Sequence, residues 1–127
     1  MIDQITTTLR WIEHEGKPIL FADYSGVDML DLQNEVKANE QAIVELGSKG
    51  FRDLLVLTDV RNCHVDLAAV SAFQSVTTAM KPITKGSAVI GISKLRKILL
   101  EAVNRFSKLE TRAFDNLEEG KEWLVGL

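Results

Sequence analysis

The most reactive side chains of this 127-residue chain lie close together, at Asp59, Asn62, Cys63, His64 and Asp66. Carboxylates, a thiol and an imidazole are the groups that bind metals or carry nucleophilic catalysis. Adjacent residues rarely point both side chains at one atom, and the chain has no second cysteine and no HxxxH spacing. His14 lies in a different predicted element. We therefore predict a ligand-edge loop here and no metal site in the chain. The Asp59 carboxylate either orients a ligand or caps this loop.

A second group of residues is basic, and it opens a predicted helix. It comprises Ser93, Lys94, Arg96 and Lys97. The positive end of the helix dipole disfavours cations in the first turn. The arrangement therefore indicates either a site for an anion or acidic partner, held by N–H groups and basic side chains, or a solvated helix face.

Other chemistry has little support in the sequence. We find no set of nucleophile, base and oxyanion donors, and no pair of carboxylates with a shared site, so we predict that the protein is not an enzyme. Gly26, Gly86 and Gly91 form neither a GxGxxG motif nor a P-loop, and we predict no cofactor. We expect Gly91 to allow the close approach of a helix or of backbone.

Hydrophobic periodicity indicates the elements that position these residues. It predicts strands over 6–15, 18–24, 51–60, 88–92 and 110–115, and helices over 28–47, 67–80, 93–106 and 117–124. Asp28, Asp66 and Asn116 are the expected N-caps, and Pro82 ends the second helix. This order predicts an α/β protein whose mixed, mostly parallel sheet of about five strands begins with a β-hairpin and carries four helices.

The stretch 87–106 is the most informative part of the pattern, because a buried strand leads directly into an amphipathic helix. The helix carries one apolar stripe, which we expect to face the core: Leu95, Ile98, Leu99, Ala102, Val103 and Phe106. Substitution of Ile98 or of Val56 by alanine is therefore predicted to reduce stability by about 2–5 kcal/mol.

Ligands of open α/β sheets bind outside the carboxyl ends of parallel strands. In this chain those positions are 23–28, 59–66, 93–97 and 115–116. Aromatic side chains elsewhere could line an apolar pocket, although core or subunit contacts are the commoner role. They are Trp11, Phe114 and Trp123.

Composition limits the class of protein. The chain is 46% hydrophobic and 26% charged, has a net charge of −3 and one cysteine. We predict a single domain over 1–127 in the cytoplasm, with no signal peptide, no membrane span and no nucleic-acid partner.

Several segments resemble a known family. They are DYSG at 23–26, LLVLTDVRN at 54–62, MKPITKGSAVIGISKLRKILLEAVNRFS at 80–107 and FDNLEEGKEWL at 114–124. The chain resembles the STAS/SEC14 family, in its SpoIIAA-like branch of small bacterial proteins. The resemblance implies a STAS-like fold, which is shared with anti-sigma factor antagonists and related to lipid-binding SEC14 domains. Most members of the branch have no assigned biochemical role.

The chain departs from the family pattern at one functional position. Well-known STAS members carry a phosphorylatable serine at the start of the helix after the third strand. Here the segment reads VRNCHVDLAAVSAF, and its first serine, Ser71, lies a full turn inside the predicted helix. The family's phosphorylation switch is therefore not expected in its usual form.

These observations favour a non-catalytic regulatory or protein-interaction module that binds a protein partner or forms a homodimer. We expect Lys94→Glu to abolish partner binding, and Cys63→Ala and His64→Ala to leave stability unchanged. The alternative is a SEC14-like binder of a small apolar or lipid-like ligand, which requires a cavity on the order of several hundred Å³.

Overall fold

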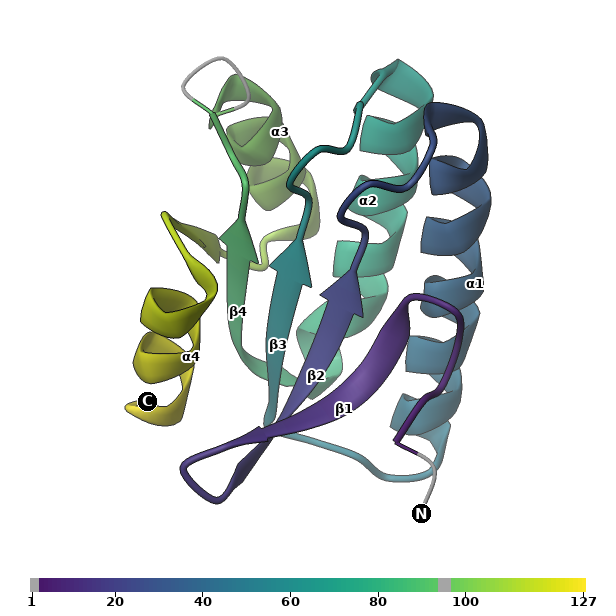
Figure 1. Ribbon diagram of the computed structural model, residues 1–127. Coiled ribbons are helices and arrows are strands. Elements are labelled where there is room, and N and C mark those ends of the chain that lie inside the picture. Colours follow the sequence, from purple (N-terminus) through teal and green to yellow (C-terminus); the bar gives the residue numbers. More distant parts are fainter. Residues whose placement is uncertain (1–2, 94–96) are drawn as a thin grey trace.

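The computed structural model describes residues 3–93 and 97–127 (Figure 1). The elements in chain order are β1 (Leu9–His14), β2 (Lys17–Asp23), α1 (Met29–Ser48), β3 (Leu54–Asp59), α2 (Leu67–Met80), the 3₁₀ turn η1 (Lys81–Ile83), β4 (Thr84–Ile90), α3 (Lys97–Ser107), β5 (Thr111–Phe114) and α4 (Leu117–Val125). Within the described residues, the predicted five strands and four helices are confirmed.

The strands form one mixed sheet in the order β1-β2-β3-β4-β5. The hairpin pairs β1 with β2 antiparallel, whereas β2, β3, β4 and β5 are parallel neighbours. Helices α1, α2 and α3 lie on one face of the sheet and α4 lies on the other (Figure 1). Since each parallel strand leads into a helix, the starts of all four helices lie at the carboxyl edge of the sheet.

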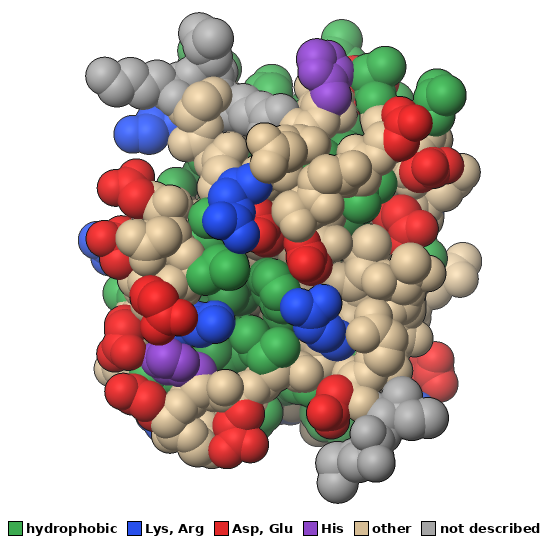
Figure 2. Space-filling view, viewed as in Figure 1, with side chains coloured by type: hydrophobic (Ala, Val, Ile, Leu, Met, Phe, Trp, Pro, Cys, Tyr) green, Lys and Arg blue, Asp and Glu red, His purple; other side chains and the backbone are tan. Residues whose placement is uncertain are grey.

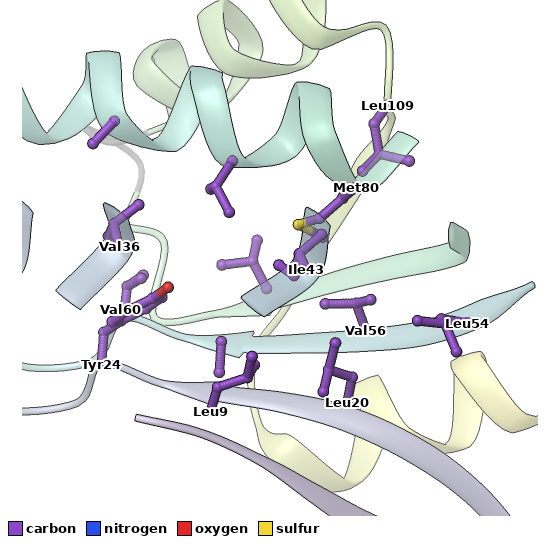
Figure 3. Close-up of a cluster of buried hydrophobic side chains, with 14 of the residues drawn as sticks. Leu9, Leu20, Tyr24, Val36, Ile43, Leu54, Val56, Val60, Met80 and Leu109 are labelled. Carbon is purple, nitrogen blue, oxygen red and sulfur yellow. The ribbon is translucent and has the colours of Figure 1, made fainter. Parts of the chain in front are cut away.

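Alternating side chains of the strands feed a separate hydrophobic cluster on each face. In β3, Leu54 and Val56 join the larger cluster beneath α1 and α2, while Leu55 and Leu57 join the smaller cluster against α4. Figure 3 shows side chains of the strands and helices meeting in the larger cluster. The contiguous apolar run of this strand therefore predicted correctly that both of its faces are covered.

Local signals for the helix ends were also correct. The side chains of Asp28, Asp66 and Asn116 accept hydrogen bonds from backbone N–H groups in the first turns of α1, α2 and α4. Helix α2 ends at Met80, directly before Lys81 and Pro82. The short turn η1 that follows was not anticipated.

The strand boundaries differ from the prediction. β1 begins at Leu9 and β3 begins at Leu54, so both strands are shorter than expected. β4 begins early, at Thr84, and ends at Ile90 because Gly91 has a φ of 98° that turns the chain out of the sheet.

The prediction that the whole apolar stripe of α3 faces the core is wrong. Val103 is buried, but Ile98 is 74% exposed and Phe106 is 62% exposed. The physical reason is that α3 packs chiefly against α2, so only part of its apolar surface meets the rest of the molecule. The large loss of stability predicted for Ile98→Ala is therefore not expected, whereas Val56 is buried as predicted.

Candidate functional site

The loops that follow the parallel strands meet at the carboxyl edge of the sheet (Figure 1). Backbone hydrogen bonds join them: Tyr24 N–H donates to Asp59 O at 2.9 Å, and Gly26 N–H donates to Arg61 O at 3.1 Å. Val60 N–H donates to Ile90 O at 2.9 Å. Of the segments expected at this edge, 23–28 and 59–66 are therefore neighbours, with the end of β4 beside them, and 115–116 follow Phe114, the register partner of Ile90. Positions 94–96 lie outside the described residues.

Asp59 ends β3 with its carboxylate buried, at 1% exposure. Arg61 Nε donates to both carboxylate oxygens at 3.1 Å, Arg61 Nη2 donates to Oδ2 at 2.7 Å, and the Arg61 backbone N–H donates to Oδ1 at 3.0 Å. These bonds occupy the acceptor positions of the carboxylate. The hydrogen bonds that Arg61 donates to Asp59, together with the negative charge of Asp59, raise the pKa of Arg61. Of the two roles left open for Asp59, the geometry favours capping of the loop.

Asp23 lies beside Asp59, because the two residues are register partners at the ends of β2 and β3. The Asp23 carboxylate accepts from the backbone N–H of Ser25 at 3.1 Å and lies 3.9 Å from Arg10 Nη1. This register brings two carboxylate-bearing residues to the carboxyl edge of the sheet. Each carboxylate has an arginine partner, so the pair does not present the uncompensated acid and base of hydrolytic chemistry.

The other residues of the predicted ligand-edge loop point to different places. Cys63 is buried at 2% exposure in the larger core cluster, whereas Asn62 and His64 are exposed. Asp66 Oδ1 accepts from Ala69 N–H at 2.8 Å and so caps α2. Because the Cys63 side chain belongs to the core, Cys63→Ala is no longer expected to leave stability unchanged.

Two of the four residues of the predicted basic group lie within the part of the chain that the structure describes. Ser93 and Lys97 are exposed, and Lys97 N–H donates to Ser93 O at 3.2 Å at the start of α3. Lys94 and Arg96 lie outside the described residues. The preceding Gly91 packs closely on the loop after β3, since a Cβ there would lie 2.7 Å from Arg61 N. This contact is the close backbone approach expected for Gly91.

Three large apolar side chains lie exposed near the starts of the three helices on one face of the sheet. Leu30 of α1 is 80% exposed, Leu67 of α2 is 83% exposed and Ile98 of α3 is 74% exposed. We call these three residues the apolar rim. Figure 2 shows hydrophobic side chains gathered at the upper end of the molecule, over the starts of α1 and α2.

Sequence reasoning missed the apolar rim, because the apolar spacing placed Ile98 and Leu67 on the inner faces of their helices and Leu30 was not singled out. A local signal was available for both leucines, which follow an N-cap within two residues. First-turn positions beside a cap face the open end of a helix, where the fold itself offers little apolar cover.

A cavity of about 90 Å³ lies between the sheet and the helices α1, α2 and α3. Its walls are mostly apolar and include Val65, Phe73, Ile92, Leu99 and Leu100. The aromatic residues that could have formed a pocket lie elsewhere: Trp11 stacks on Phe51, and Phe114 packs on Trp123.

A mixed five-stranded sheet with an N-terminal hairpin and four helices defines this chain as an α/β protein of SpoIIAA-like fold. The chain is similar to an uncharacterised protein of the DUF3478 family from Shewanella loihica PV-4, whose crystal structure shows a SpoIIAA-like fold. The two are 18% identical, 91% of each chain is covered, and the TM-score is 0.67. The predicted STAS-like architecture is therefore confirmed, and a likeness at this identity concerns the fold alone.

The other comparisons give no function for the chain. No family model and no curated protein matches it. Among the described residues, no helix has the length and apolar character that crossing a membrane requires.

Proposed function

We propose that this chain is a non-catalytic regulatory module that binds a protein partner through the apolar rim. The observation that carries the proposal is the position of Leu30, Leu67 and Ile98, each at least 74% exposed, near the starts of helices on the same face of the sheet. Exposed apolar side chains gathered at one end of a soluble domain are typical of interaction sites.

The dimensions and energies of the rim suit an interface. Neighbouring packed helices lie about 8–10 Å apart, so three adjacent helices spread the rim over roughly 20 Å. Complete burial of a leucine or isoleucine contributes about 1.5–3 kcal/mol, and three such side chains could provide the apolar centre of an interface. Exposed polar and charged neighbours, including His64, Asp66 and Lys97, would form its border.

The proposed module does not use the phosphorylation switch of well-known STAS members. The first turn of α2 begins with Leu67, Ala68 and Ala69, which have no hydroxyl group. Ser71 is exposed, but it borders a polar depression between α1 and α2 rather than the start of the helix. We further propose that residues 1–127 act as one domain in the cytoplasm, in keeping with a single cysteine.

The test compares rim variants with a matched variant elsewhere. Leu67→Glu and Leu30→Glu place a charge in the rim, while Val44→Glu places the same charge at a 57% exposed position in the second half of α1. Each protein is produced in its natural host, purified and measured by native mass spectrometry. We expect a bound partner protein with the wild type and with Val44→Glu, and its loss from both rim variants.

Two results would overturn the proposal. One is a wild-type chain that is monomeric and carries no other protein under conditions that preserve complexes. The other is a partner that remains bound equally well to Leu67→Glu and Leu30→Glu. A second copy of the chain in place of a different protein, lost from the rim variants alone, would identify the interaction as homodimerisation through the same surface.

The apolar cavity bears on a second candidate function, the binding of a small apolar ligand. A cavity of about 90 Å³ is smaller than the roughly 150 Å³ that accommodates benzene in an engineered core. It is also smaller than the several hundred Å³ expected for a lipid-like ligand, so a lipid would require α3 to move away from the sheet. A small molecule that is retained in native mass spectra and lost on denaturation would support this candidate, and purely apo spectra would count against it.

A further inference from the structure

Three metal-ligating side chains meet where the β1–β2 hairpin turns beside α4. They are His14 at the end of β1, Glu15 in the turn and Glu122 in α4. One ligand atom from each lies within 4.8 Å of the ligand atoms of the other two. Figure 1 shows the hairpin turn and the end of α4 near the edge of the sheet opposite the starts of the helices. The cluster is therefore separate from the apolar rim.

The distances are close to those of a metal site. His14 Nε2 and Glu122 Oε1 form a hydrogen bond of 2.9 Å, and a metal ion would replace the proton that they share. A tetrahedral site requires roughly 3.4 Å between its ligand atoms. The three ligand atoms lie within 4.8 Å of one another, so the two most distant atoms have to approach each other by up to about 1.4 Å. Glu15 and Glu122 are exposed and can make this adjustment, while the 18% exposed side chain of His14 supplies a fixed ligand.

The charges around the cluster also favour a cation. Two carboxylates and an imidazole converge there, and in the described part of the chain neither glutamate forms an ion pair with a lysine or arginine. The nearby lysines are engaged elsewhere: Lys17 Nζ donates to Val125 O at 2.6 Å, and Lys121 Nζ lies 3.6 Å from Glu118. A divalent ion would neutralise both glutamates.

We propose that His14, Glu15 and Glu122 bind a Zn²⁺ ion that fastens the β1–β2 hairpin to α4. One imidazole nitrogen and two carboxylate oxygens are zinc ligands, and water completes the coordination at this partly exposed position. The proposal is independent of partner binding by the apolar rim. It departs from the prediction of no metal site in this chain, which set His14 aside because His14 and His64 lie in different elements.

Isothermal titration of the tag-free, chelator-treated full chain with zinc chloride tests the proposal. We expect one ion per chain, with zinc affinity weakened at least about tenfold in His14→Ala and in Glu122→Gln. Even the loss of a group that only hydrogen-bonds to a metal ligand lowers metal affinity by about 10–100-fold. His64→Ala is the matched control, because the chain has two histidines and His64 is exposed in a different loop. It should bind zinc as the wild type does.

A second measurement separates loss of the site from loss of the fold. Glu122→Gln keeps the size of an exposed side chain, so its far-ultraviolet circular dichroism should match that of the wild type. Zinc should raise the melting temperature of the wild type and of His64→Ala but not that of Glu122→Gln. Absence of stoichiometric binding to the wild type, binding abolished by His64→Ala, or unchanged binding by Glu122→Gln would each overturn the proposal.

Discussion

The buried side chain of Asn39 is expected to hold the N-terminal segment against α1, and Asn39→Leu tests this role. Asn39 is 0% exposed. Its Nδ2 donates to Thr8 Oγ1 and to the Tyr24 hydroxyl oxygen, both at 2.8 Å, and its Oδ1 accepts from the Thr6 hydroxyl. Leucine fills a similar volume but leaves three hydroxyl groups without these partners.

The expected loss follows from the number of hydrogen bonds. Each of the three contributes about 0.5–1.5 kcal/mol, and stranded buried hydroxyls add to the loss, so Asn39→Leu should lower the free energy of unfolding by about 2–4 kcal/mol. A domain of this size is stable by about 5–15 kcal/mol, which makes the change easy to measure by urea denaturation. Asn34→Leu is the matched control, because Asn34 is exposed on the same helix; its effect should stay within about 0.5 kcal/mol.

A double-mutant cycle with Tyr24→Phe identifies the cause. Tyr24→Phe removes one hydrogen bond of Asn39, so the two substitutions should not be additive, with a coupling free energy of about 0.5 kcal/mol or more. A loss below about 1 kcal/mol for Asn39→Leu, or strict additivity with Tyr24→Phe, would refute the reasoning.

Three further predictions concern titration, helix packing and a tight turn. Burial raises the pKa of Tyr24 above its ordinary value of 10.0. The free energy of unfolding should therefore be constant with respect to this group below about pH 10 and should decline as the pH rises further. The chain has a single tyrosine, so its tyrosinate absorbance should appear together with unfolding rather than near pH 10 in folded protein. Val103→Ala should reduce the free energy of unfolding by about 1–3 kcal/mol, whereas Ile98→Ala should change it by less than about 0.5 kcal/mol; equal effects in urea denaturation would contradict the packing of α3. Gly91→Ala should destabilise the fold by more than Gly26→Ala in the same assay. Both glycines have positive φ, but only the Cβ added at Gly91 meets the backbone of the loop after β3. Equal losses of stability would show that this contact is unimportant.

The fold was predictable where local signals determine it. Asp66 as N-cap and Pro82 after the helix gave the exact bounds of α2, because both act within a few residues of the helix ends. The hairpin was predictable from a short turn between two strand patterns. In the structure, this turn pairs His14 with Lys17. The 87–106 segment correctly predicted a strand followed by a helix.

The candidate sites depend on contacts between distant parts of the chain, which periodicity does not specify. Asp23 and Asp59 each end a strand, but their adjacency requires knowledge that β2 and β3 are neighbours in register. His14 and Glu122 are separated by 108 residues. Only the packing of α4 across the sheet brings them together, and no motif spacing could have indicated it.

Helix α3 links the error in the predicted core to the proposed function. Its sequence pattern predicts a wide apolar stripe, yet the fold buries Val103 while Ile98 and Phe106 remain mostly exposed. The pattern reports how much apolar surface the sequence provides and does not report which molecule covers it. A stripe wider than the contact with α2 leaves Ile98, one of the three residues of the apolar rim, exposed. If a partner covers the apolar rim, the apolar spacing of α3 reflects burial of side chains in the complex as well as burial within the isolated chain.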